Sequence, residues 1–133
     1  METTSSLDPL ASGSVSLGSA PGFTPGGIAS RPLLQAPDVR VVWMGLDAGQ
    51  ELTEHATPKR ALVAILEGRC DFQWAGEWQR LGPGDLVHLV PGAVHALKAL
   101  TRTAILLILI PAPVAPPPSP QTIPRLSLVA DEG

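Results

Sequence analysis

Apolar side chains in the middle of the chain fall into short runs and alternations that are typical of β-strands. Residues Val39–Leu46 form an apolar run rich in β-branched side chains, which stops at Asp47, Ala48 and Gly49. Across Cys70–Trp74 apolar and polar residues alternate, so three apolar side chains share one face of a strand. Five further segments have strand character: residues 61–66, 78–81, 86–90, 95–100 and 104–110. The pattern predicts about seven strands.

Turn residues separate these segments. Gly82, Pro83, Gly84 and Asp85 form one strong turn signal, and Pro91 with Gly92 forms another. No segment has a convincing helical pattern, and the strands share no repeated motif. Regularly spaced short strands favour an all-β fold, a sandwich or a barrel.

Composition divides the chain into three zones. Residues 1–35 are rich in serine and glycine, and we expect a flexible N-terminal tail because such a stretch buries little apolar surface. Residues 36–111 form the expected barrel. Residues 112–133 are rich in proline, which favours an extended C-terminal tail. The alternative for either tail is a segment that contacts a partner.

Charge and hydropathy narrow the class of protein. The net charge is −3 and shows no basic patch, so a nucleic-acid partner is not expected. No apolar run approaches the length of a membrane-spanning helix, and no secretory signal follows Met1. We therefore expect a soluble, cytoplasmic protein. Its single cysteine, Cys70, excludes an internal disulfide and most simply packs as a small apolar group.

The last predicted strand carries information about assembly. Residues 104–110 are apolar at every position, so both faces of the strand need apolar neighbours. One face must meet the core, and the other meets a second sheet or a second subunit. The barrel is small and marginally stable alone, and residues 31–110 carry eight basic and eight acidic side chains. These features predict a homodimer.

Two stretches resemble the conserved motifs of the cupin superfamily. The first runs from Gly49 through His55 to Gly68, and the second runs from Gly84 to His95 with the turn Pro91-Gly92 inside it. The resemblance covers roughly residues 36–111. It implies a single small double-stranded β-helix, also called a jelly-roll barrel, which in this superfamily is often dimeric.

The resemblance also implies a ligand set, which this chain keeps only in part. Metal-binding cupins carry two histidines and a glutamate in the first motif and a third histidine in the second. His55 matches the first histidine and His95 matches the last, whereas Thr57 stands where the second histidine would be. The glutamate position falls near Ala61 or Leu62. We expect His55 and His95 to approach each other inside the barrel, with any Zn, Fe, Ni or Cu held weakly.

His88 is the candidate third ligand. It lies on the predicted strand 86–90, and strand parity alone does not decide whether it points into the barrel or outward. An inward His88 would complete the metal site, whereas an outward one would be a surface or interface residue. The residues predicted to line the ligand pocket are His55, Thr57, Trp74, His88 and His95. For the tryptophan, core packing is an equal alternative, and Glu51 and Glu54 are expected on a solvated loop.

Three functions follow from these residues. The first is a barrel that binds a small molecule, with the histidines orienting it by hydrogen bonds and a divalent metal bound weakly or not at all. The second is a metal-dependent enzyme of the dioxygenase or isomerase type. The third is a structural or partner-binding domain whose pocket has lost its role. The missing metal ligands disfavour the second function, and the retained histidines disfavour the third.

Overall fold

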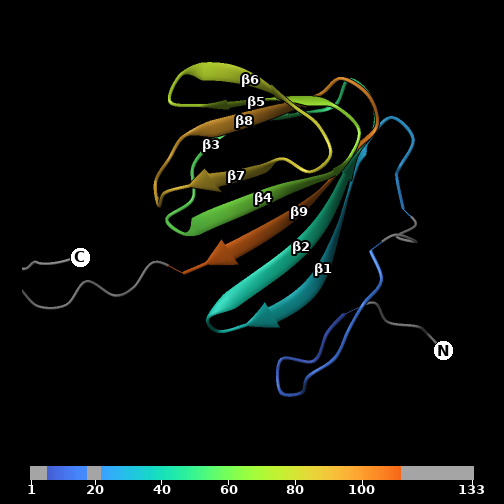
Figure 1. Ribbon diagram of the computed structural model, residues 1–133, viewed down its shortest axis with the longest axis vertical. Coiled ribbons are helices and arrows are strands. Elements are labelled where there is room, and N and C mark those ends of the chain that lie inside the picture. The colour runs from blue at the N-terminus through green and yellow to red at the C-terminus, as the bar shows by residue number, and fades with distance from the viewer. Residues whose placement is uncertain (1–5, 18–21, 112–133) are drawn as a thin grey trace, which may run out of the picture.

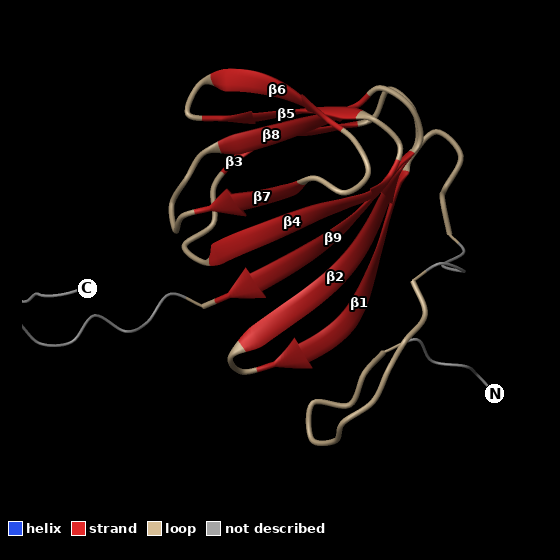
Figure 2. Cartoon of the chain, in the orientation of Figure 1, coloured by secondary structure: helices blue, strands red, loops and turns tan. Residues whose placement is uncertain are grey.

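The computed structural model describes residues 6–17 and 22–111, and in these ranges it contains nine β-strands and no helix (Figure 1, Figure 2). The strands are β1 (Ile28–Ala36), β2 (Val39–Leu46), β3 (Glu51–His55), β4 (Arg60–Glu67), β5 (Cys70–Trp74), β6 (Glu77–Leu81), β7 (Leu86–Leu89), β8 (His95–Ala99) and β9 (Thr103–Ile110). No described segment is a helix that could cross a membrane.

The strands form two antiparallel sheets that face each other (Figure 1). The larger sheet has the order β1-β2-β9-β4-β7, and the smaller sheet has the order β3-β8-β5-β6. The predicted all-β barrel is therefore confirmed. Each of the seven predicted strands corresponds to an observed one, and β1 and β3 are the two strands that the sequence pattern did not predict.

Strand β9 lies at the centre of the larger sheet, hydrogen-bonded to β2 on one side and β4 on the other. Its side chains alternate between two apolar environments. Ile105, Leu107 and Leu109 point between the sheets, where they join the main core, whereas Leu106 packs against a second apolar cluster on the outer face. A strand that is apolar at every position suits this place, because both of its faces have apolar neighbours.

The main core fills the space between the sheets. Its buried members include Leu46, Val63, Ile65, Phe72 and Leu97, which come from both sheets. Burying one such side chain stabilises the fold by about 1.5–3 kcal/mol relative to leaving it exposed. Cys70 also lies in this core, as predicted, and burial raises the pKa of its thiol to about 11. The thiol is therefore protonated at neutral pH and serves as packing.

The N-terminal boundary of the barrel needs correction. Strand β1 begins at Ile28, ahead of the predicted start at residue 36, and pairs along its length with β2. Leu33 is only 2% exposed and packs with Trp43 on the outer face of the sheet. Residues further upstream also contact the sheet, because the Leu7 N–H donates to the Leu33 carbonyl at 2.6 Å and Phe23 lies edge-on to Trp43.

The physical reason for the correction is that β1 is an edge strand. Pro32 has no N–H to donate, which an edge strand tolerates, and a β-bulge between Pro32 and Leu34 turns Leu33 toward the sheet surface. The remaining parts of the two predicted tails, residues 1–5, 18–21 and 112–133, lie outside the described residues.

A tight hairpin between β5 and β6 shapes the open end of the barrel. Its two turn residues, Ala75 and Gly76, have φ values of 56° and 78°. Two successive residues with positive φ are typical of a type I′ turn. The backbone twist of this turn matches the twist of the two strands that it joins. The turn directly follows Trp74 and fixes where that side chain leaves the sheet.

Candidate functional site

His55 and His95 meet on the inner wall of the smaller sheet. Strands β3 and β8 pair antiparallel, and a register irregularity between Leu52 and His55 aligns His55 with His95. The two imidazole ring centroids lie 4.1 Å apart at an interplanar angle of 60°. The predicted approach of these two histidines is therefore present, and it arises from neighbouring strands of one sheet.

Backbone hydrogen bonds fix the proton on each ring. His55 Nδ1 lies 2.7 Å from the Thr53 carbonyl oxygen, and His95 Nδ1 lies 3.0 Å from the Ala93 carbonyl oxygen. A carbonyl only accepts, so each Nδ1 carries the hydrogen and donates it. A neutral imidazole with its hydrogen at Nδ1 offers Nε2 as an acceptor. Neither Nε2 has a hydrogen-bond partner among the residues that the structure describes.

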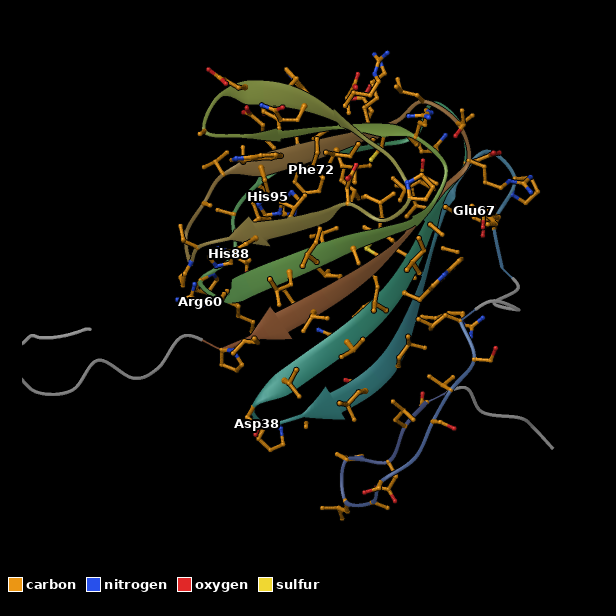
Figure 3. All side chains as sticks on the ribbon, in the orientation of Figure 1. Asp38, Arg60, Glu67, Phe72, His88 and His95 are labelled. Carbon is orange, nitrogen blue, oxygen red and sulfur yellow. The ribbon has the colours of Figure 1, made fainter. Side chains whose placement is uncertain are left out.

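The two histidines differ in burial. His95 is 8% exposed and stacks against Phe72 (Figure 3), with ring centroids 6.2 Å apart and an interplanar angle of 17°. His55, in contrast, is exposed. Burial lowers the pKa of His95 below 6.5, and the neighbouring His55 lowers it further, while the hydrogen bond to Ala93 acts in the opposite direction. His95 is therefore neutral at physiological pH and offers a lone pair from a mostly buried position.

A small apolar cavity of ≈ 130 Å³, which we call the inner cavity, lies beside this pair. Apart from His55 and His95, every lining side chain is apolar: Met44, Leu52, Val63, Phe72, Leu97, Ile105 and Leu107. These residues come from both sheets, so the cavity lies within the barrel. The inner cavity is therefore apolar, with the imidazoles of His55 and His95 as hydrogen-bond acceptors on one wall.

A larger hollow of ≈ 360 Å³, the outer cavity, lies near the β5–β6 hairpin and the end of β7. Its lining residues are Glu54, Gln73, Trp74, Ala75, Gly76, His88, Leu89, Val90, Ala93 and Val94. It borders the histidine pair through chain neighbours, because Glu54 precedes His55 and Trp74 is the register partner of His95. Among the described residues that line it, Glu54 and His88 have ionisable side chains.

The structure corrects the candidate role of His88 as a third metal ligand. On β7, Val87 and Leu89 are buried in the core, so the alternating His88 points to the outer face. Its Nε2 accepts a hydrogen bond of 2.7 Å from Arg60 Nη1, and the two side chains lie together away from His95 (Figure 3). His88 thus lines the outer cavity but does not join His55 and His95.

Thr57 is not part of either cavity lining. Its hydroxyl accepts a hydrogen bond from the Lys59 N–H at 3.2 Å, and its carbonyl accepts one from the Gly92 N–H at 2.8 Å. The threonine therefore holds two turns in place beside the site.

Trp74 lines the outer cavity and also packs edge-on to Phe72 and against the core. The two alternatives for this residue, cavity lining and core packing, are therefore both present.

The available donors do not fit a tightly held metal. Structural and catalytic transition-metal sites use three or four protein ligands, and only two imidazoles converge here. In residues 6–17 and 22–111 no group of three histidine, cysteine, aspartate or glutamate side chains is placed to hold an ion. Ala61 and Leu62 occupy the place of the family glutamate and offer no ligand atom.

Sequence reasoning missed the apolar lining of the inner cavity. The signal was present, because Val63, Phe72 and Leu97 lie at inward positions of predicted strands. Strand parity identifies which residues point inward, but it does not tell which of them leave a cavity between them. Glu54 was also missed as a lining residue, because β3 was expected to be a loop.

A barrel of two facing antiparallel sheets, with an apolar cavity and two histidines between them, belongs to the jelly-roll class of folds. The comparisons with known proteins agree with this class. The family model of the Cupin domain matches residues 42–111, so the chain belongs to the cupin family. None of the curated proteins matched this chain.

Solved structures share the fold. A conserved protein of unknown function from Streptococcus pyogenes is 26% identical, with a TM-score of 0.71, covering 85% of this chain and 100% of that chain. A cupin superfamily protein from Desulfitobacterium hafniense is 21% identical, with a TM-score of 0.69, and the match covers 72% of this chain and 88% of that chain. A salicylate 1,2-dioxygenase variant from Pseudoaminobacter salicylatoxidans is 20% identical, with a TM-score of 0.59, covering 70% and 28%. At these identities the last two show the fold alone.

Proposed function

We propose that this protein binds a small, mainly apolar molecule in the inner cavity and orients it by hydrogen bonds to Nε2 of His55 and His95. The observation that supports this most strongly is the Nε2 of the mostly buried His95, which has no hydrogen-bond partner among the described residues. An acceptor buried without a partner costs about 1–3 kcal/mol, and a donor group on a ligand would remove this cost.

The size and lining of the inner cavity set the ligand class. An apolar cavity of about 150 Å³ accommodates one benzene molecule, so ≈ 130 Å³ suits a single small ring or a short branched chain. The apolar lining binds the body of such a molecule by burial. The two imidazoles select for a hydroxyl or amine because they offer lone pairs.

The proposal is tested by measuring phenol and toluene binding by calorimetry with the full chain. The two probes have nearly the same shape, but only phenol donates a hydrogen bond. His95→Phe should reduce the preference for phenol over toluene by about tenfold, the worth of one hydrogen bond to a buried acceptor. His88→Phe is the matched control and should leave the preference unchanged. Failure of both probes to bind the wild-type chain would contradict the proposal.

A weakly held divalent metal is the second part of the proposal. The two adjacent imidazoles each offer one Nε2 lone pair, so together they would supply two ligands to a Zn, Fe, Ni or Cu ion, and water would supply the others. Such a site would be weak and pH-dependent because protons compete for the imidazoles. A metal-dependent enzyme is the alternative function, and it would require further ligands that the described residues do not supply.

A further inference from the structure

We propose that the ligand is a small protonated amine on an apolar body, and that the lining of the two cavities selects this class against carboxylic acids. This inference rests on the proposed function and extends it by assigning the charge of the ligand.

The inner cavity favours hydrogen-bond donors over acceptors. Both imidazoles present Nε2 lone pairs, since each Nδ1–H is used by a backbone carbonyl. An ammonium group has three donors and no acceptor, whereas a carboxylate has only acceptors. A carboxylate beside the two histidines would bring its oxygen lone pairs against the Nε2 lone pairs, which is repulsive. The other lining side chains are apolar and offer no donor to the carboxylate.

The outer cavity favours positive charge. Glu54 contributes a carboxylate to its lining and forms no ion pair with any described residue; the described ion pairs join Arg80 to Asp71 and Arg102 to Asp47. Trp74 contributes an aromatic ring, and aromatic π systems attract ammonium groups. An amine whose body enters the inner cavity would therefore place its charge near the Trp74 ring and the Glu54 carboxylate.

Arg60 is the cation that opposes this argument, and its position limits its influence. Its guanidinium donates to His88 Nε2 at 2.7 Å on the outer face of the larger sheet, and it does not line either cavity. His88, which lines the outer cavity, is its hydrogen-bond partner there. An acid bound in the cavities would have to draw Arg60 away from this hydrogen bond.

The experiment compares three probes that share a benzyl or phenyl body: benzylamine, benzyl alcohol and benzoate. Calorimetry with the full chain at pH 7.5 and low salt should give affinities in that order, with benzylamine about tenfold tighter than benzoate. Glu54→Gln should weaken benzylamine about two- to fivefold, the effect of a partly solvated charge pair, and leave benzyl alcohol unchanged. Glu51→Gln is the matched control, since Glu51 is exposed on the same strand and lines neither cavity.

The outcomes separate the two proposals. Benzyl alcohol binding without any preference for benzylamine would overturn the amine assignment and leave the binding function standing. Benzoate binding most tightly, with loss of this binding in Arg60→Gln, would also overturn it and identify an acid as the ligand. Absence of binding for all three probes would contradict both proposals together.

Discussion

His95 is the residue on which the account depends most closely. It is placed on β8 by the register with β3 and β5, and its ring is stacked on Phe72 and oriented by the Ala93 carbonyl. Burial holds the ring neutral, and the hydrogen bond from Nδ1 to Ala93 leaves Nε2 as the acceptor that the proposed ligand would use. The sequence could predict that His95 lies near His55, because both positions match family motifs. It could not predict the ring orientation, which depends on a backbone carbonyl two residues away.

The lowered pKa of His95 predicts a pH dependence of stability. The unfolded chain binds a proton at this residue near pH 6.5, whereas the folded chain binds it only at lower pH. Stability is therefore fully present above pH 6.5 and is lost as pH falls from there toward the folded pKa. Urea unfolding at pH 7.5 and pH 5.5 should show a lower unfolding free energy at the acidic pH, and His95→Phe should reduce this difference.

The comparison variant for this measurement is His88→Gln, which removes a histidine from the outer face and leaves His95 in place. Asp47 does not disturb the comparison. Backbone hydrogen bonds from Gly26 and Ala48 lower its pKa below 3.8, so its contribution is lost only at more acidic pH. An unchanged pH dependence in His95→Phe would show that another group is responsible.

Strand β9 shows what alternation can and cannot predict. A run of apolar residues identified the strand but did not reveal which side chains face the core, because both faces are apolar. The structure resolves this: Leu107 lines the inner cavity, and Ile108 shares the outer face with Leu106.

Strand β1 was missed for a different reason. Its sequence includes Ser30, Arg31 and Pro32, and its stability comes from pairing with β2 and from the buried Leu33, which a local pattern does not report.

Leu107 and Ile108 of β9 point to opposite faces of the larger sheet, and substituting each in turn tests the proposed homodimer. Leu107→Glu places a charge in the inner cavity and should destabilise the fold by roughly 3 kcal/mol. Ile108→Glu changes the outer face between Val41 and Leu62, so it should leave the fold intact and abolish self-association. Thermal unfolding and sedimentation velocity at micromolar concentration distinguish the two effects. A wild-type chain that sediments as a monomer of 13.9 kDa at every concentration would contradict the dimer.

At the scale of the whole molecule, the fold followed from local patterns, and the site followed from how the sheets pack. The turns and strand runs predicted an all-β sandwich or barrel, and the family resemblance implied the jelly-roll barrel. The inner cavity depends on residues from β2, β3, β4, β5, β8 and β9 meeting at one place. Whether such residues fill the space or leave a cavity is decided by packing of both sheets, which no single segment encodes.

The incomplete donor set predicts weak metal binding by the whole protein. Purified protein should carry Zn, Fe, Ni or Cu at well below one ion per chain, and a mild chelator should remove it without unfolding, because the fold is held by the apolar core. Elemental analysis before and after chelation, with thermal unfolding alongside, measures both effects. One ion per chain that survives prolonged chelation would mean that another residue completes the site.

The central claim is that paired imidazole acceptors on the wall of an apolar cavity receive a donor group of the ligand. Long-range proton–nitrogen NMR correlation on the ¹⁵N-labelled chain observes these atoms directly. We predict that both rings carry hydrogen at Nδ1 and that the Nε2 resonance of His95 moves upfield on addition of phenol but not toluene, with His88 unaffected. Hydrogen at Nε2 of His95 in the free protein, or an Nε2 resonance that stays unchanged while phenol binds, would contradict the account.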